Sequence, residues 1–239
     1  GIAIGLNSNL AEIVCYNNQL TILDVSSNPV LLKLNCSNNQ LTSLDLSTNT
    51  SLTYVNCSNN ELTSLNLKNG NNNNMTGGNY WETGIDSRNN PDLFCIQVDN
   101  ATNAASYYTW YEDFWTEYHV DCSGFTLEKA YIPDDNFEQA LISLGYDYGT
   151  PNDYVPVTSL KKVTSLNLGY KNISDLTGIE YFTALTTLKC HSNQLAACDL
   201  SNNINLTYID CTYNQITQLE VSENSKLQTL YCYHNKLID

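Results

Sequence analysis

A motif of eleven residues recurs six times along the chain, always with a cysteine at its sixth position. The copies carry Cys15, Cys36, Cys57, Cys190, Cys211 and Cys232. Within each group of three, neighbouring cysteines are 21 residues apart. A chain that repeats at such a period stacks one short structural unit on the next. The sequence therefore predicts two short solenoid blocks that flank an insert.

Each copy fits the pattern L-x-x-L-x-C-x-x-N-x-L, which is typical of a leucine-rich repeat with cysteine in place of the middle leucine. A short strand in each copy should point alternate side chains into the core. We expect parallel strands around residues 13–15, 34–36, 55–57, 188–190, 209–211 and 230–232. In the third copy the core side should hold Leu52, Val55, Cys57 and Leu62, and the solvent side Thr53, Tyr54, Asn56 and Ser58.

The asparagine of the motif should bend inward after the strand, where its amide can satisfy backbone groups that the turn leaves unpaired. Stacked coils would then form two asparagine ladders, made of Asn18, Asn39 and Asn60 and of Asn193, Asn214 and Asn235. A second half-motif, LTSLDLS at 41–47 and QLEVS at 218–222, is expected to form the return side of each coil.

The insert predicts a boundary between two domains. Residues 1–125 should form the first repeat block with a closing cap over about 70–125, in which the aromatic-rich stretch 103–122 is expected to be helical. Residues 126–239 should begin with a helical opening cap over about 126–160, in which Asp135 and Glu138 form a capping box and Gly145 ends the helix. Residues 163–173 follow as a degenerate first coil, with Lys171 at the ladder position. The fold class expected is an α/β solenoid dominated by β structure.

Nine cysteines would ordinarily suggest a disulfide framework. Six of them are the repeat cysteines, and Cys198 occupies the place of Leu44 in the matching half-motif. Cys95 and Cys122, both in the insert, are the remaining candidates for a disulfide pair. The alternative is that these two are also reduced core thiols.

The formal net charge of −15 argues against binding to nucleic acid, because phosphate recognition needs a basic surface. No apolar run approaches the roughly 20 residues that a membrane helix needs.

The chain begins without an initiator methionine or a signal peptide, as a mature or excised piece would. Its two ends also match each other in repeat phase, which predicts a unit of a longer array or head-to-tail self-association into a filament. The alternative is a trimmed fragment whose ends match because of the period.

The repeats such as LTYVNCSNNELTSLNL, the closing stretch NNPDLFCIQVDN and the opening IPDDNFEQALISLG together resemble a known family. It comprises secreted, multi-block leucine-rich-repeat proteins of gliding and surface-colonising Gram-negative bacteria, similar in style to internalin-like repeats. The resemblance implies an extracellular or cell-surface location, export by the type IX route and a role in adhesion or binding.

The residues do not favour an enzyme. The three histidines are His119, His191 and His234, and the last two lie two coils apart, too far to share one metal ion. Cys190 and His191 should point to opposite sides of one strand, which argues against a nucleophile–base pair. No carboxylate pair in a cleft is evident for a hydrolase. No cofactor or metal is expected. Calcium is a minor candidate at Asp134–Asp135 or over 147–153, although neither stretch has the alternating ligands of a calcium loop.

The outward face of the second block carries tyrosines and short polar groups at strand spacing. Its candidate binding residues are Tyr208, Asp210, Tyr213, Tyr231, Tyr233 and His234. Tyrosine offers contact area at low entropic cost together with a hydroxyl, as recognition surfaces do. The sequence thus favours a non-enzymatic adhesion or binding module for a protein or polysaccharide. The alternatives are that these residues merely suit exposed strands, and that the solenoid is a structural spacer or fibre shaft without a specific ligand.

Overall fold

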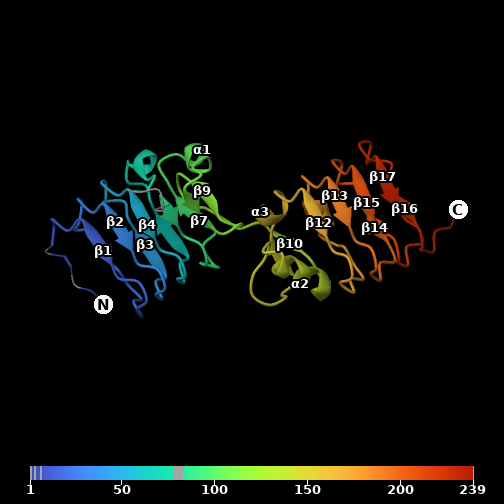
Figure 1. The fold of residues 1–239 in the computed structure, drawn as a ribbon, viewed down its shortest axis with the longest axis horizontal. Helices are drawn as coiled ribbons and strands as arrows, with labels where there is room; N and C mark the ends of the chain where they lie inside the picture. The colour runs from blue at the N-terminus through green and yellow to red at the C-terminus, as the bar shows by residue number, and fades with distance from the viewer. Residues whose placement is uncertain (1, 3, 6, 78–82, 239) are drawn as a thin grey trace. The chain divides into compact units, whose positions relative to one another are not determined.

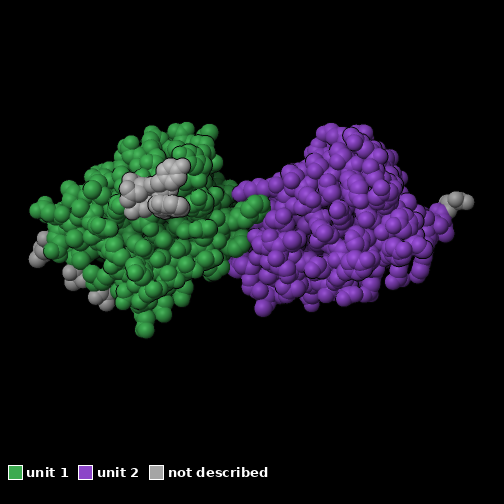
Figure 2. All heavy atoms as spheres, viewed as in Figure 1, with its two compact units in different colours: residues 1–126 green, residues 127–239 purple. Residues whose placement is uncertain are grey.

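The computed structural model describes residues 2, 4, 5, 7–77 and 83–238. The chain divides into two compact units, Gly1–Thr126 and Leu127–Asp239 (Figure 2). We call them unit 1 and unit 2. The sequence placed the boundary between residues 125 and 126, one residue earlier.

Unit 1 is a solenoid whose coils contribute strands to two parallel sheets (Figure 1). The first sheet runs in the order β1 (Glu12–Val14), β2 (Lys33–Asn35), β4 (Tyr54–Asn56), β6 (Ile85–Asp86) and β8 (Trp110–Tyr111). The second sheet, on the return side, contains β3 (Ser43–Asp45), β5 (Ser64–Asn66), β7 (Cys95–Gln97) and β9 (Glu117–His119). Two short helices, η1 (Asn72–Asn74) and α1 (Ala101–Ala104), lie in the connections.

Unit 2 opens with a cap and continues as a second solenoid. The cap contains the antiparallel strands β10 (Lys129–Tyr131) and β11 (Tyr154–Pro156) and the helices α2 (Asp135–Ser143) and α3 (Val157–Leu160). A parallel sheet follows in the order β12 (Ser165–Asn167), β13 (Thr187–Lys189), β15 (Tyr208–Asp210) and β17 (Thr229–Tyr231). The return side carries η2 (Ile179–Tyr181), β14 (Cys198–Asp199) and β16 (Leu219–Glu220).

The strands of both units begin and end one residue earlier than the sequence predicted. The strand centre, such as Leu34 or Ile209, points inward, and the repeat cysteine is the first residue after the strand. That cysteine is still directed into the core because it lies two residues after the inward-pointing strand centre and so continues the alternation. Cys15, Cys36, Cys57, Cys190, Cys198 and Cys211 are buried free thiols, and Cys232 is half-buried.

The prediction that Ser58 faces solvent is wrong, and Thr212, at the same repeat position in unit 2, also faces inward. Both are buried, because each forms hydrogen bonds to the side chain two positions earlier. The hydroxyl and amide of Ser58 donate to Oδ1 of Asn56 at 2.7 and 3.0 Å. Thr212 makes the same pair of bonds to Asp210.

The closing segment of unit 1 is not the helix that its sequence suggested. Its helix α1 spans only Ala101–Ala104, after which β8 pairs in parallel with β6 and β9 with β7. The sheet edges left by the repeats present unpaired backbone groups, and extra strands satisfy them better than a helix can. Trp110 is buried and donates its indole N–H to the carbonyl of Met75 at 2.8 Å. In the structure Cys95 and Cys122 form a disulfide that joins β7 to the end of this segment.

The opening helix of unit 2 begins differently from the predicted capping box. Its N-cap is Asp134, whose carboxylate accepts the N–H groups of Asn136 and Phe137 at 3.0 Å, so the assignment to Asp135 is wrong by one residue. Glu138 does not reach back to the cap. It is fully buried and accepts the N–H groups of Asn152 and Asp153, which anchors the 145–153 loop to the helix. Gly145 lies just beyond the helix with a φ of +78°.

Asp147 is expected to make unit 2 less stable as the pH rises. Burial, together with the adjoining carboxyl of Glu138, raises the pKa of Asp147 from 3.8 to about 6. The folded unit therefore binds a proton more tightly than the unfolded chain between these values, and stability falls as the pH rises through this window. We expect Asp147→Asn to remove this slope and to raise the free energy of unfolding at pH 7 by about 1 kcal/mol, allowing for screening by solvent.

Thermal unfolding between pH 4 and pH 8 measures the effect of Asp147→Asn, with Glu223→Gln, an exposed carboxylate of the same unit, as the control. A variant that kept the native pH dependence would show that Asp147 is not the group responsible.

Candidate binding surface

The six residues predicted to bind a ligand lie on β15, β17 and the turns that follow them, within one unit. We call this set, Tyr208, Asp210, Tyr213, Tyr231, Tyr233 and His234, the tyrosine face. Strand pairing places Asp210 directly opposite Tyr231. Tyr213, Tyr231 and Tyr233 are 52%, 46% and 58% exposed, so about half of each residue remains available to a ligand.

The rings of the tyrosine face contact one another across neighbouring coils. Tyr208 and Tyr231 meet edge to face with centroids 5.7 Å apart, as do Tyr213 and Tyr233. Tyr213 stacks on His234 at 4.4 Å and an interplanar angle of 18°. Edge-to-face and offset contacts of this kind hold aromatic side chains in place. The face is therefore a pre-ordered cluster rather than a set of independent side chains.

Two charged groups border the rings. The ammonium of Lys189 lies 5.9 Å from the ring centroid of Tyr208, within the range of a cation–π contact. The carboxylate of Asp210 is fixed by its bonds to Thr212. Loss of hydration, followed by the proximity of Asp210, raises the pKa of Tyr208 above its ordinary value of 10.0. Its hydroxyl is protonated at neutral pH, as that of any tyrosine with an ordinary pKa is, and can donate a hydrogen bond.

The turns after β1, β2, β4 and β6 of unit 1 and after β12, β13, β15 and β17 of unit 2 each contain a residue in the left-handed backbone region. In unit 1 this residue is asparagine at all four positions: Asn17, Asn38, Asn59 and Asn89, with φ between 53° and 60°. In unit 2 the equivalent residues are Tyr170, Ser192, Tyr213 and His234, with φ between 55° and 58°. We call these four the left-handed stripe. Asparagine tolerates this conformation better than tyrosine does, so unit 2 holds Tyr213, a residue of the tyrosine face, at a conformational cost.

His191 belongs to the same side of unit 2 but packs on the preceding coil. Its ring meets that of Tyr170 edge to face at 5.0 Å and covers the α-carbon of Gly169, where a β-carbon would lie 2.6 Å from the imidazole. The absence of a side chain at residue 169 therefore makes room for the histidine.

The six ladder asparagines all bond to backbone groups. Asn60, for example, donates to the carbonyls of Cys36, Cys57 and Ser58 and accepts the N–H of Leu41, which links its own coil to the previous one. Asn39, Asn193, Asn214 and Asn235 also bridge two coils. The side chain of Asn18 is exposed and, among the described residues, bonds only within its own coil, to the carbonyls of Cys15 and Tyr16. Asn193 also accepts the N–H of Lys171, which stands at the ladder position of the degenerate coil.

Sequence reasoning missed two further sets of asparagines. Asn90 continues the ladder of unit 1, bonded to the carbonyls of Cys57 and Ser87 and to the N–H of Leu62. Each unit also has a second ladder along its return side, made of Asn28 and Asn49 in unit 1 and of Asn203 and Asn224 in unit 2. These four side chains are buried, and each donates to carbonyls of an adjacent coil. The 21-residue spacing from Asn28 to Asn49 and from Asn203 to Asn224 was the available signal.

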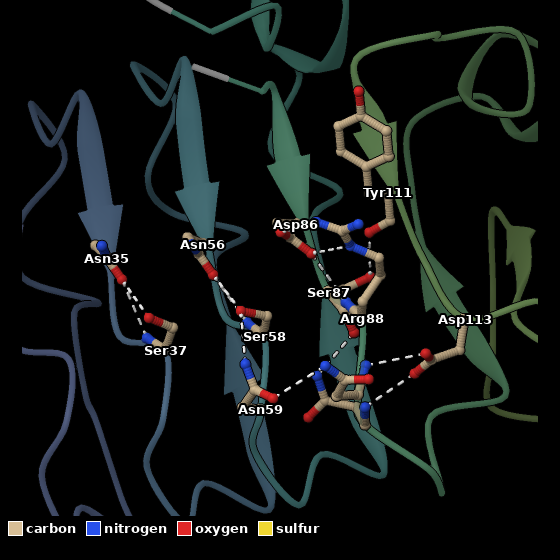
Figure 3. Close-up of polar contacts among 12 residues, drawn as sticks. Asn35, Ser37, Asn56, Ser58, Asn59, Asp86, Ser87, Arg88, Tyr111 and Asp113 are labelled. Carbon is tan, nitrogen blue, oxygen red and sulfur yellow. Dashed lines mark hydrogen bonds and ion pairs between the residues drawn. The ribbon is translucent and has the colours of Figure 1, made fainter. Parts of the chain in front are cut away.

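The corresponding surface of unit 1 is polar rather than aromatic (Figure 3). The side-chain oxygens of Asn35 and Asn56 each accept hydrogen bonds from the N–H and hydroxyl of the serine two residues later in the sequence. In the next coil Asp86 takes this place and binds Arg88, whose guanidinium lies 4.8 Å from the ring centroid of Tyr111. Figure 3 also shows Asp113, which accepts the N–H groups of Asn89 and Asn90 at 2.9 Å. These carboxylates are engaged by the protein itself.

One of the candidate calcium ligands, Asp134, has several partners within the protein. Asp134 caps α2 and also accepts the N–H and hydroxyl of Ser174. Among the described residues, no group of three or more His, Cys, Asp or Glu side chains could hold a metal ion. His191 and His234 lie in separate ring contacts. No helix in the described ranges is long and apolar enough to cross a membrane.

Comparisons with known proteins agree with this architecture. A segment of 73 residues, 30% of the chain, is 37% identical to internalin J of Listeria monocytogenes serotype 4b (strain F2365). The chain is a leucine-rich-repeat protein. Its fold is a leucine-rich-repeat solenoid dominated by β structure. No protein-family model matches the chain.

Two solved Listeria monocytogenes structures are also similar to this leucine-rich-repeat chain. One is the functional domain of InlJ, which includes a cysteine ladder. The sequence identity is 28% and the TM-score is 0.33, and the match covers 100% of this chain and 43% of the InlJ chain. The other is an internalin, inlF, at 16% identity and a TM-score of 0.33, over 95% and 75% of the two chains. The matched segment spans 8% of internalin J.

Proposed function

We propose that the chain is a non-catalytic binding module whose second unit presents the tyrosine face to a macromolecular ligand at the cell exterior. The observation that carries the proposal is the exposed, mutually ordered ring cluster of Tyr208, Tyr213, Tyr231, Tyr233 and His234. Rigid aromatic side chains bury much area on binding and lose little entropy, as in antibody paratopes. The similarity to internalin J supports a role in recognition.

Adhesion and export are part of this proposal, in line with the resemblance to secreted repeat proteins of surface-colonising bacteria and their type IX route. The bond between Cys95 and Cys122 supports an extracellular location, because structural disulfides persist mainly in oxidising compartments. A spacer or fibre-shaft role would need no ordered aromatic cluster on one unit.

The test replaces Tyr208, Tyr231 and Tyr233 together with serine. We expect the variant to fold and to lose at least about 100-fold in affinity for its ligand, because clustered tyrosines act as binding hot spots. Native and variant chains are compared on an array of immobilised proteins and polysaccharides. Tyr131 and Tyr154, an exposed ring pair on the opening cap with centroids 5.7 Å apart, are replaced with serine as the matched control.

Loss of binding in the triple variant alone supports the proposal. Equal binding by the native chain and the triple variant, or no binding by the native chain, would favour the spacer role instead.

A further inference from the structure

One core position on the return side of unit 2 departs from the repeat pattern. The half-motif places leucine there in other coils, at Leu44, Leu65 and Leu219, whereas the coil of β13 and β14 has Cys198. Strand pairing establishes the equivalence, because Cys198 lies opposite Leu219 just as Leu44 lies opposite Leu65. This coil therefore has two inward-facing cysteines, one beside each of its two strands.

The second cysteine of this coil is Cys190, which follows β13. Both residues belong to one core cluster, in which Cys190 is fully buried and Cys198 is 6% exposed. A hydrogen bond between the two thiols, together with burial, holds the pKa of Cys190 well above its ordinary value. Cys211 of the next coil bonds instead to the carbonyl of Tyr231, at 3.4 Å. Cys190 is thus the thiol best placed to react with Cys198.

Cys198 can be reached from outside the core, because it lines a cavity of about 400 Å³ on the return side of unit 2. The carboxylates of Asp175, Glu180 and Asp199 line the same cavity. One oxygen of each carboxylate accepts the backbone N–H of a neighbouring residue, which fixes the side chain. A cleft lined by one sign of charge concentrates reagents of the opposite sign. This cavity therefore favours small cationic molecules over neutral or anionic ones.

We propose that Cys198 is a thiol–disulfide exchange site for small cationic disulfides and that Cys190 resolves the product. The Sγ of Cys198 attacks one sulfur of the incoming disulfide, which releases one thiol and leaves a mixed disulfide in the cavity. The Sγ of Cys190 then attacks the Sγ of Cys198 and displaces the second thiol. The proton of each protein thiol passes to a leaving thiolate. One external disulfide is reduced to two thiols, and the two cysteines are oxidised to one disulfide.

The order of the two steps follows from the surroundings of the thiols. The raised pKa of Cys190 keeps this thiol protonated, and it has no exposed surface, so the first attack comes from Cys198. The new bond would join β13 to β14 within one coil and constrain the unfolded chain. It would stabilise the unit that carries the tyrosine face, but its formation does not depend on the proposed function of that face.

The experiment treats the folded full chain with cystamine, a small disulfide with two ammonium groups, and then denatures and alkylates it. The untreated chain should take up seven alkyl groups, one for each free cysteine, and the treated chain five, because Cys190 and Cys198 are consumed. A digest should contain the peptides of these two residues joined by a disulfide. Bis(2-hydroxyethyl) disulfide, of similar size but uncharged, should react at least about tenfold more slowly, after correction for the rates of both reagents with free cysteine.

Cys198→Leu is the matched variant, because it restores the residue that Leu44, Leu65 and Leu219 hold in other coils. It should fold and take up six alkyl groups both before and after treatment, one fewer than the native chain. Asp175→Asn with Asp199→Asn should remove the preference for cystamine and leave the bond able to form.

Seven groups after treatment of the native chain would overturn the proposal. So would a stable cystamine adduct on Cys198, a bond from Cys198 to Cys211, or loss of alkyl groups in Cys198→Leu. Equal corrected rates for the two disulfides would overturn the assignment of a cationic substrate.

Discussion

Replacement of Asn60 with alanine is expected to lower the free energy of unfolding of unit 1 by about 3–4 kcal/mol. Asn60 is 5% exposed, so water cannot replace its side chain. The change would leave the N–H of Leu41 without its partner at 3.0 Å and would remove a donor from three carbonyls in two coils. An unsatisfied buried backbone group costs about 1–3 kcal/mol. Urea unfolding followed by circular dichroism measures the loss.

Asn18 provides the matched control for Asn60, because it occupies the same repeat position. Its side chain is exposed and, within the part of the chain that the structure describes, bonds only to the carbonyls of Cys15 and Tyr16, in its own coil. We expect Asn18→Ala to cost about 1 kcal/mol or less. Equal losses for the two variants would contradict the view that the ladder stabilises the solenoid by joining coils.

Removal of the disulfide by Cys95→Ser with Cys122→Ser is expected to cost about 3.5 kcal/mol. The bond spans a sequence separation of 27 residues, and the entropy of closing a loop of that length in the unfolded chain gives this value. The segment that the disulfide ties down carries β8 and β9, the last strands of the two sheets of unit 1, so the loss should appear as earlier unfolding of this unit. Urea unfolding of the native and double-serine chains measures it, with Cys198→Ser as a thiol control outside the pair.

Mass spectrometry after alkylation tests the pairing itself. The denatured, unreduced chain should take up seven alkyl groups, one for each free cysteine, and the reduced chain nine. Nine groups before reduction would show that Cys95 and Cys122 are core thiols, as the alternative interpretation of the sequence held.

The repeat period was enough to predict the solenoid, because burial of the same positions in every coil leaves few other arrangements. Leu34, Val55 and Ile209 are buried as their alternation required. The exact strand ends were beyond the pattern, since the repeat cysteine continues the alternation but lies outside the strand. Ser58 is buried next to Cys57 because it bonds to the side chain of Asn56, which the alternation does not predict.

The closing segment shows where local pattern fails. Asn100 caps a helix by accepting the N–H of Asn103, as its sequence suggests, but the helix ends at Ala104. Beyond it, the free edges of β6 and β7 determine the structure, and those edges are created by residues far away in sequence. Tertiary pairing overrides weak local preference in such a case.

The tyrosine face was predictable from strand alternation, which places Tyr208, Asp210 and Tyr231 on one side of their strands. The left-handed backbone of Tyr213 and His234 was not, because strand alternation carries no information about the conformation of the turn that follows the strand. Only alignment with Asn38 and Asn59 of unit 1, two residues after the cysteine in the same repeat, would have indicated it.

Hydroxyl-radical footprinting of the chain with and without a bound ligand tests the central claim most directly, because it reports the solvent exposure of individual side chains. We expect the ligand to protect Tyr213, Tyr231 and Tyr233. It should not protect Tyr154 of the opening cap or Tyr108 of unit 1, which is 91% exposed. Protection confined to unit 1, or to Tyr154 and its neighbours on the cap, would contradict the assignment of the tyrosine face as the binding surface.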